Sequence, residues 1–242
     1  MTADYDRRQL TRRESLLELG GLAATVAGVV AWAGEKLLEP ASARAAGAGP
    51  AAVTSGLVTC VLTPEMTEGP YFVSGDKVRR NVTEGKRGTP LLLRLTVLDV
   101  SSCKPISRAA VDIWHADAGG LYSEEALLGT EGQTFLRGIQ RTDANGVATF
   151  RTVYPGWYMG RTVHIHVKVY LGGRTVHTGQ LFFPDSLTDA VYKRSPYNRR
   201  LSRDTRNTTD SIFRNGGKRS MLALRKSGGG YVGRITMGVS RS

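Results

Sequence analysis

The chain has 242 residues, of which 33 are Lys or Arg and 21 are Asp or Glu, so its formal net charge is +12. This length fits one large β domain or two small ones, and a count of two cysteines excludes a scaffold that depends on many disulfides. Basic residues are dense between Lys193 and Lys226, but no nucleic-acid-binding motif accompanies them. We therefore expect no nucleic-acid partner and interpret this stretch as a solvated basic face.

The N-terminal residues 1–45 predict an export signal rather than a part of the fold. Two arginines at 12–13 precede a Gly/Ala/Val-rich run, and "ARAA" at 43–46 offers a cleavage site of small residues. This pattern resembles a twin-arginine signal. The alternative is an uncleaved anchor, but the apolar run 19–34 is shorter than the roughly 20 residues that span a membrane. We expect cleavage after Ala45, an extracellular or cell-envelope location, and membrane contact only during export.

The small, Gly/Pro/Ser-bearing residues 46–56 predict a flexible lead-in to a domain at 57–242. In an exported chain, Cys60 and Cys103 indicate one structural disulfide. Neither cysteine lies in a CxxC motif or beside a histidine, so we expect no redox or nucleophilic role for them.

Short β-like runs separated by turn signals dominate the rest of the chain. Strands are expected at 89–100, 109–116, 137–141, 147–153, 161–171, 174–183 and 230–239. The pair Asn145-Gly146 predicts a hairpin between the third and fourth strands, and Gly172-Gly173 predicts one between the fifth and sixth. Residues 184–217 have weak helical and loop character. The fold class is therefore predicted to be all-β, a β-sandwich of mostly antiparallel strands with loop and short-helix excursions.

The stretch "GWYMGRTVHIHVKV" carries two histidines inside one expected strand. Because side chains alternate along a strand, His164 and His166 share one face, and the aliphatic residues between them face a core on the other side. Two adjacent imidazoles are costly to bury without a shared partner, which favours a metal site. We interpret the other two histidines, His115 and His177, as structural.

Four motifs stand in a fixed order between Leu57 and Phe183: "TPEMTEGPYF", "VDIWHADAGGLYS", "FLRGIQRTDANGVATFRTVYPGWYMGRTVHIHVKV" and "TGQLFFP". Together they resemble the intradiol ring-cleaving dioxygenases, which include the catechol 1,2- and protocatechuate 3,4-dioxygenases. The C-terminal part resembles an exported, single-domain branch of this family.

The resemblance implies one non-haem iron(III) per chain, with the ligands Tyr122, Tyr158, His164 and His166. The donor set is chemically consistent, because a trivalent cation displaces the phenol proton and hard phenolate oxygens favour the ferric state.

The resemblance also assigns catalytic residues. Arg161 matches a family arginine that stabilises the ketonised substrate, and Gln180 matches a glutamine beside the substrate. Tyr158 matches a tyrosinate that is displaced from the metal when the diol binds. Tyr71 and Tyr154 are expected as walls of the substrate pocket.

The implied activity is cleavage of catechol-type rings between their two hydroxylated carbons with O2, giving cis,cis-muconate-type products. The expected partners are a small aromatic diol and O2, and a homodimer is compatible with the sequence. The alternative is an exported β-sandwich binding module in which the His pair holds a structural zinc or copper without oxygenase activity. Such a module has no need for Tyr122, Tyr158 and Arg161 at the same site.

Overall fold

The computed structural model describes residues 60–75, 77–200 and 202–241, and eight strands account for most of its regular structure. The predicted signal at 1–45 and lead-in at 46–56 lie outside the described residues. The strands are β1 (Pro90–Asp99), β2 (Ala110–Trp114), β3 (Arg137–Arg141), β4 (Val147–Val153), β5 (His164–Leu171), β6 (Arg174–Phe182), β7 (Ala223–Ser227) and β8 (Gly230–Val239).

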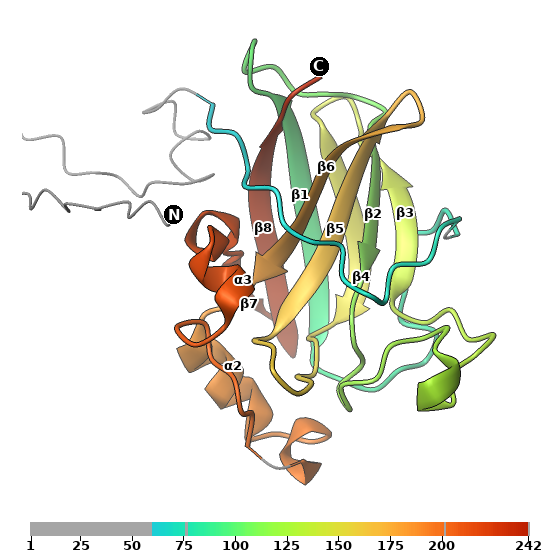
Figure 1. Ribbon diagram of the computed structural model, residues 1–242, viewed down its shortest axis with the longest axis vertical. Helices are drawn as coiled ribbons and strands as arrows, with labels where there is room; N and C mark the ends of the chain where they lie inside the picture. The colour runs from blue at the N-terminus through green and yellow to red at the C-terminus, as the bar shows by residue number, and fades with distance from the viewer. Residues whose placement is uncertain (1–59, 76, 201, 242) are drawn as a thin grey trace, which may run out of the picture. The chain divides into compact units, whose positions relative to one another are not determined.

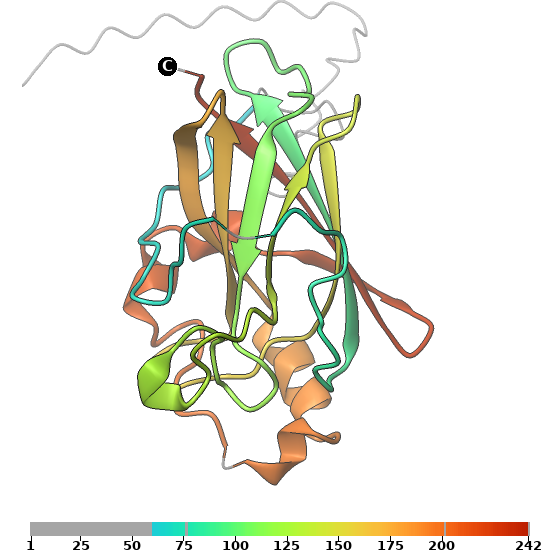
Figure 2. The same ribbon diagram turned by 90° about the vertical axis from the view of Figure 1, so that its right-hand side faces the viewer.

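The strands form two four-stranded sheets, in the orders β4-β1-β8-β7 and β3-β2-β5-β6 (Figure 1). Neighbouring strands are antiparallel except for β1 and β8, which run parallel from Leu91 opposite Tyr231 to Asp99 opposite Val239. Figure 2 shows the sheets from the side, with the β7–β8 hairpin extending past its neighbours. The predicted all-β sandwich of mostly antiparallel strands is confirmed.

The hairpin predicted at Asn145-Gly146 is wrong, because β3 and β4 belong to different sheets. The turn itself forms, since the Asp143 carboxylate accepts the backbone N–H of Val147 at 2.9 Å. The carbonyl of Gly146, however, accepts the backbone N–H of Val97 at 2.8 Å, and β4 continues along β1. The turn therefore moves the chain from one sheet to the other, which a local turn signal does not reveal.

The second predicted hairpin is confirmed, since β5 and β6 pair on either side of Gly172 and Gly173. Both glycines have positive φ, 57° and 82°, as a tight turn matched to the twist of two strands requires.

The core lies between the two sheets and is built from strand residues two apart in sequence. On β1 and β5 these buried residues are Leu91, Leu93, Leu95, Val97, Ile165, Val167 and Val169. Among the described residues, none of the helices has the length and apolar character needed to cross a membrane.

Segments without strands cover the sandwich and position the site. Helices α2 (Asp185–Tyr192) and α3 (Ser211–Arg214) and the 3₁₀ turns η2 (Tyr197–Arg199) and η3 (Gly217–Ser220) lie between β6 and β7, and η1 (Ala126–Leu128) follows β2. The N-terminal part of the described chain, 60–75, crosses the outer face of the sheet that holds β5 and β6 (Figure 1). Its first residue, Cys60, forms the predicted disulfide with Cys103.

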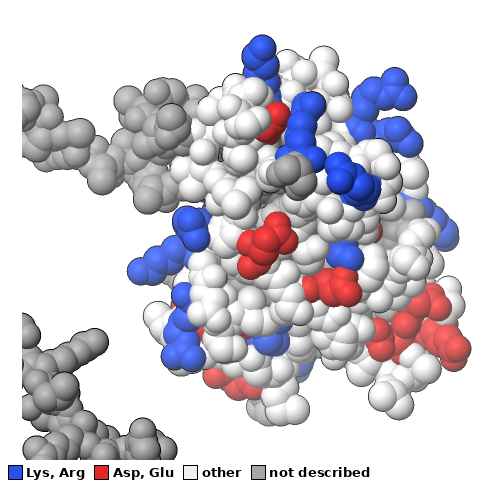
Figure 3. All heavy atoms as spheres, turned by 45° about the horizontal axis from the view of Figure 1, so that its top comes forward, with Lys and Arg blue, Asp and Glu red and all other residues white. Residues whose placement is uncertain are grey.

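The basic residues are less concentrated in space than in sequence. On the face shown in Figure 3, Lys and Arg side chains are interspersed with Asp and Glu. Within the 193–226 stretch, Arg203 binds both Asp185 and Asp189 and its side chain is only 5% exposed, while Arg206 also binds Asp189. The solvated basic face expected there is therefore partly an internal network of ion pairs.

Candidate metal and active site

The two histidines of β5 lie on the outer face of their sheet, with their rings directed at each other. Their Nε2 atoms are 3.0 Å apart, and both side chains are buried. The neighbouring Ile165 and Val167 point the other way, into the core. The alternation expected for this strand is thus present.

The Thr162 carbonyl fixes the orientation and protonation of His164. Its oxygen lies 2.6 Å from Nδ1, and because a carbonyl only accepts, Nδ1 carries the proton and Nε2 presents its lone pair. Burial, reinforced by the Arg161 guanidinium, lowers the pKa of His164 to about 3. Burial and the neighbouring His164 also hold the pKa of His166 well below its usual value. Both imidazoles are therefore neutral at pH 7, the form that binds metal.

The ring of His166 is clamped between two neighbours. Trp114 of β2 is its partner in register, and the two rings stack at 4.9 Å with an interplanar angle of 7°. On the segment that crosses this face, a Cβ on Gly69 would lie 3.2 Å from Cε1 of His166, and the φ of Gly69 is +72°. Glycine at this position lets the backbone approach the imidazole closely.

The two tyrosines come from loops on either side of the histidines. Tyr158 precedes β5, and its hydroxyl lies 3.1 Å from Nε2 of His164. Tyr122 follows β2 and is buried, and its ring centroid is 5.5 Å from that of Tyr158. Burial raises the pKa of both phenols, for Tyr122 well above its usual value, and the Tyr158 hydroxyl adds to that increase. The structure thus brings all four predicted ligands together.

The donor set fits a hard trivalent cation. Within the described part of the chain, the buried Tyr122 hydroxyl has no hydrogen-bond partner of normal geometry, and a buried unpaired hydroxyl is costly. Two imidazole lone pairs and two phenols that a trivalent metal can deprotonate supply nitrogen and hard oxygen ligands. A ferric ion would satisfy the Tyr122 oxygen.

Arg161 and Gln180 flank this cluster. Arg161 donates through Nη2 to Oε1 of Gln180 at 2.5 Å, and its Nη1 lies 3.4 Å from the Tyr158 hydroxyl. Gln180, opposite His166 on β6, donates its amide to the Thr67 carbonyl at 2.9 Å, which leaves Oε1 free to accept from Arg161. Arg161 and Gln180, two of the three residues predicted as catalytic, therefore lie beside the predicted ligands, and the third, Tyr158, is itself one of those ligands.

The two expected pocket walls differ in position. Tyr71 stacks on Tyr122 with centroids 4.2 Å apart and meets Tyr158 edge-on, so it borders the cluster. Tyr154 instead belongs to the core between the sheets, where its hydroxyl lies 2.7 Å from that of Thr188. A pocket-wall role for Tyr154 does not agree with this position. Tyr154 directly precedes Pro155 and Gly156 in the sequence, and this neighbourhood does not reveal which way its ring points.

The remaining histidines make ordinary structural contacts. Nε2 of His115 lies 2.7 Å from the Thr152 hydroxyl, and Nδ1 of His177 lies 2.9 Å from Oε1 of Glu65.

Three residues that contribute to the site were not predicted from the sequence. Trp114 lies within a recognised motif, but its contact with His166 depends on strand register. Thr162 acts through its backbone carbonyl, and because every residue has one, the residue type gives no signal. Asp210 reaches Arg161 from 49 positions further along the chain, and no pattern in the sequence signals that contact.

Comparison with known proteins agrees with this geometry. Residues 67–195 match the family model described as "Dioxygenase". The structure of an intradiol ring-cleavage dioxygenase from Tetranychus urticae is 37% identical with a TM-score of 0.70, over 75% of this chain and 95% of that one. The dioxygenase domain of a carbohydrate-binding fusion protein from Streptomyces sp. SirexAA-E is 33% identical with a TM-score of 0.60, over 75% of this chain and all (100%) of that one.

A curated relative, catechol 1,2-dioxygenase 1 from Acinetobacter lwoffii, is 35% identical over 101 residues. The match covers 40% of this chain and 32% of the relative, so the chain matches about a third of that protein's length. The family model covers more than half of this chain, and the Tetranychus structure matches it over nearly its own full length. The chain belongs to the intradiol ring-cleavage dioxygenase family.

Proposed function

We propose that this protein is a non-haem iron(III) dioxygenase that cleaves catechol-type rings between their hydroxylated carbons with O2, giving cis,cis-muconate-type products. The observation that carries this proposal is the convergence of three ligand atoms on His164: its Nε2 lies 3.0 Å from Nε2 of His166 and 3.1 Å from the Tyr158 hydroxyl. The buried Tyr122 hydroxyl, which makes no hydrogen bond of normal geometry among the described residues, lies beside them.

Tyr122, Tyr158, His164 and His166 would hold the metal. Bound iron(III) would supply a Lewis acid that takes up both oxygens of the diol and activates its ring toward dioxygen. Because the two histidines are neutral and clamped by Thr162 and Trp114, they enter this role without a proton to release and with little freedom to turn.

Tyr158 is the residue best placed to take a proton from the incoming diol. Its side chain is partly exposed, whereas Tyr122 is buried, so Tyr158 can swing away from the cluster at lower cost. Its hydroxyl also lies beside Nη1 of Arg161. The positive charge of Arg161 would stabilise the phenolate form of Tyr158 until the diol proton reaches it. Once metal binding has displaced its own proton, Tyr158 would act as the base that takes a proton from the diol, and Tyr122 would stay in place.

Arg161 would stabilise negative charge that builds on the ring. Its guanidinium is held by Gln180 and directed at the ligand cluster, so it needs no reorientation as that charge develops. A fixed donor of this kind typically contributes a few kcal/mol to lowering the barrier. The same side of the sheet is lined by Tyr71, Phe72 and Trp114. These aromatic side chains would keep water from the substrate ring.

The test is the visible absorption of the iron-loaded protein, before and after anaerobic addition of catechol, followed by oxygen uptake and product identification. We expect a broad tyrosinate-to-iron band that moves to longer wavelength with catechol. The band should weaken in Tyr122→Phe and Tyr158→Phe but not in Tyr231→Phe, a tyrosine of β8 outside the cluster. A colourless protein with stoichiometric zinc or copper would overturn the proposal and favour the binding module.

We also propose export through the twin-arginine-type sequence in residues 1–45. The Cys60–Cys103 disulfide supports this, because disulfides persist in oxidising compartments. Cell fractionation of the full chain beside an Arg12→Lys/Arg13→Lys variant tests it. Retention of only the variant in the cytoplasm is expected, and equal distribution of both would contradict export by this route.

A further inference from the structure

The guanidinium of Arg161 is fixed at two of its three nitrogens. Nε donates to Oδ2 of Asp210 at 2.8 Å, and Nη2 donates to Gln180. Because a guanidinium is planar, two fixed nitrogens also determine where the third points. The third, Nη1, lies 3.4 Å from the Tyr158 hydroxyl and 3.5 Å from Nε2 of His164.

Asp210 is itself held rigidly. Its side chain is fully buried, and Oδ2 also accepts the backbone N–H of Thr162 at 2.8 Å. Oδ1 accepts the backbone N–H of Phe213 at 2.9 Å and so caps the start of α3. Burial alone would raise the pKa of Asp210, but the two backbone N–H groups and Arg161 outweigh it and keep that pKa below its usual value.

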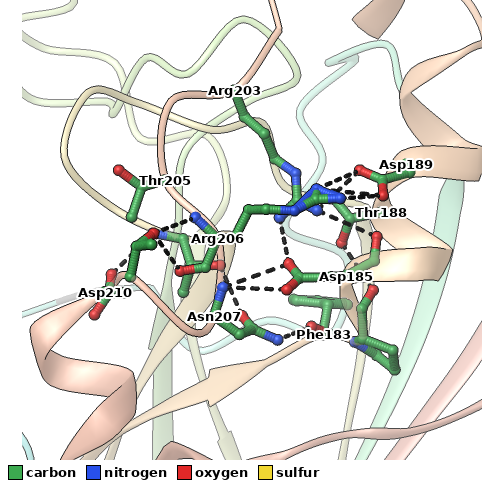
Figure 4. A network of polar contacts seen from close by, with 12 residues as sticks. Phe183, Asp185, Thr188, Asp189, Arg203, Thr205, Arg206, Asn207 and Asp210 are labelled. Carbon is green, nitrogen blue, oxygen red and sulfur yellow. Dashed lines mark hydrogen bonds and ion pairs between the residues drawn. The ribbon is translucent and has the colours of Figure 1, made fainter.

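The segment that carries Asp210 is braced against α2 (Figure 4). Arg203 binds Asp185 and Asp189, and Arg206 binds Asp189. These ion pairs join residues 203–206 to the helix that follows β6.

Asn207 ties the same segment to the residue next to Arg161. Its Nδ2 donates to the Phe183 carbonyl at 2.9 Å, and its Oδ1 accepts the Thr162 hydroxyl at 2.7 Å. Thr162 is therefore attached twice, through Asn207 and through Asp210. The loop that bears Arg161 cannot shift without breaking both attachments.

We propose that Asp210 is a positioning residue for Arg161, holding the guanidinium so that Nη1 points at the four-ligand cluster. This inference rests on the proposed function, in which Arg161 stabilises charge on the substrate ring. Asp210 lies beyond residues 67–195, the part of the chain that matches the family model, so that match does not assign it a role. The 203–210 segment would then be a support for catalysis rather than a basic surface.

Asp210→Asn and Asp210→Ser test the proposal, because Asn and Ser also cap helices but neither offers a carboxylate to Arg161. Both variants should keep the iron content and the tyrosinate band, while kcat falls about 100-fold, as misplacement of a catalytic group by about 1 Å can cause. Asp99→Asn is the matched control, since Asp99 accepts the N–H of Ser101 and pairs with Arg241 outside the site. Its kcat should equal that of the wild type.

A double-mutant cycle separates positioning from a general structural effect. On an Arg161→Ala background, Asp210→Asn should cause no further loss of kcat, because the group it positions is absent. An equal loss with and without Arg161, or an unchanged kcat in both Asp210 variants, would overturn the proposal.

A second readout does not depend on turnover. In the metal-free protein, the Arg161 Nε–H should give a slowly exchanging NMR signal in the wild type and in Asp99→Asn, and this signal should be lost in both Asp210 variants. Persistence of the signal in those variants would overturn the positioning role. An iron-loaded wild type that cleaves no catechol would instead overturn the proposed function, and the NMR result would still decide the role of Asp210.

Discussion

Nε2 of His164 and Nε2 of His166 face each other at 3.0 Å, while the Thr162 carbonyl holds the His164 proton on the opposite ring nitrogen. Two neutral rings fixed in this way present nitrogen atoms to a common point beside the two tyrosines. The chemistry of the site can therefore be tested one side chain at a time.

Replacing Tyr122 by Phe should have opposite effects in the two metal states. In the metal-free protein the variant removes a buried hydroxyl that makes no hydrogen bond of normal geometry within the described residues, so the free energy of unfolding should rise by about 1 kcal/mol. In the presence of iron the variant lacks one of the four proposed ligands, so its iron affinity should fall. Thermal unfolding with and without iron measures both effects, and a lower melting temperature of the metal-free variant would contradict this account.

Arg161→Lys should lower kcat by about 100-fold or more while the iron content stays unchanged. Lysine keeps the charge, but it cannot contact Asp210, Gln180 and the Tyr158 hydroxyl at once from one planar group. Steady-state kinetics with catechol and iron analysis of the same sample check this. If the change appeared only in KM, Arg161 would act in substrate binding rather than in the chemical step.

His115 should make the fold sensitive to acid. Burial lowers its pKa from 6.5 to about 4, so its neutral form is favoured in the folded state. Above about pH 6.5 His115 is neutral in both the folded and the unfolded state and does not lower the free energy of unfolding. As the pH falls from about 6.5 toward about 4, the unfolded state takes up a proton that the folded state does not, and the free energy of unfolding falls by on the order of 3 kcal/mol. Urea unfolding of the wild type and His115→Gln at several pH values measures it. The variant should lack this part of the pH dependence, and parallel curves for the two proteins would refute the assignment.

The disulfide should stabilise the fold without affecting the site. Cys60 and Cys103 are 43 positions apart, and closing a loop of that length stabilises a fold by up to about 4 kcal/mol in the chain-entropy model. A Cys60→Ser/Cys103→Ser variant should unfold at lower urea concentration and keep the wild-type visible spectrum. Equal urea midpoints would show that the disulfide adds nothing, and an altered spectrum would show that it also shapes the metal site.

The parts of the fold that the sequence predicted are those governed by local patterns. The last strand, Gly230–Val239, has the predicted bounds, and the alternation along β5 placed the histidines and the aliphatic residues on opposite faces. The error at Asn145-Gly146 arose because sheet membership depends on which strand pairs with β4, and that strand, β1, is more than forty positions earlier. Asp210 was missed for the same reason, since its contacts with Arg161 and Thr162 join segments distant in sequence. Thr162 was missed for a different reason, because it acts on the neighbouring His164 through a backbone carbonyl that every residue type carries.

The alternation along β5 also determines which changes of sequence in this strand the fold can tolerate. A shift of one residue in the pairing of β5 would turn both imidazoles into the core and present Ile165 and Val167 to the loops. Deleting a single residue from β5 would therefore remove stability and the proposed metal site together. Substitutions at 164 and 166 leave the inward face untouched, so the proposed metal site can be altered in the laboratory while the scaffold stays folded.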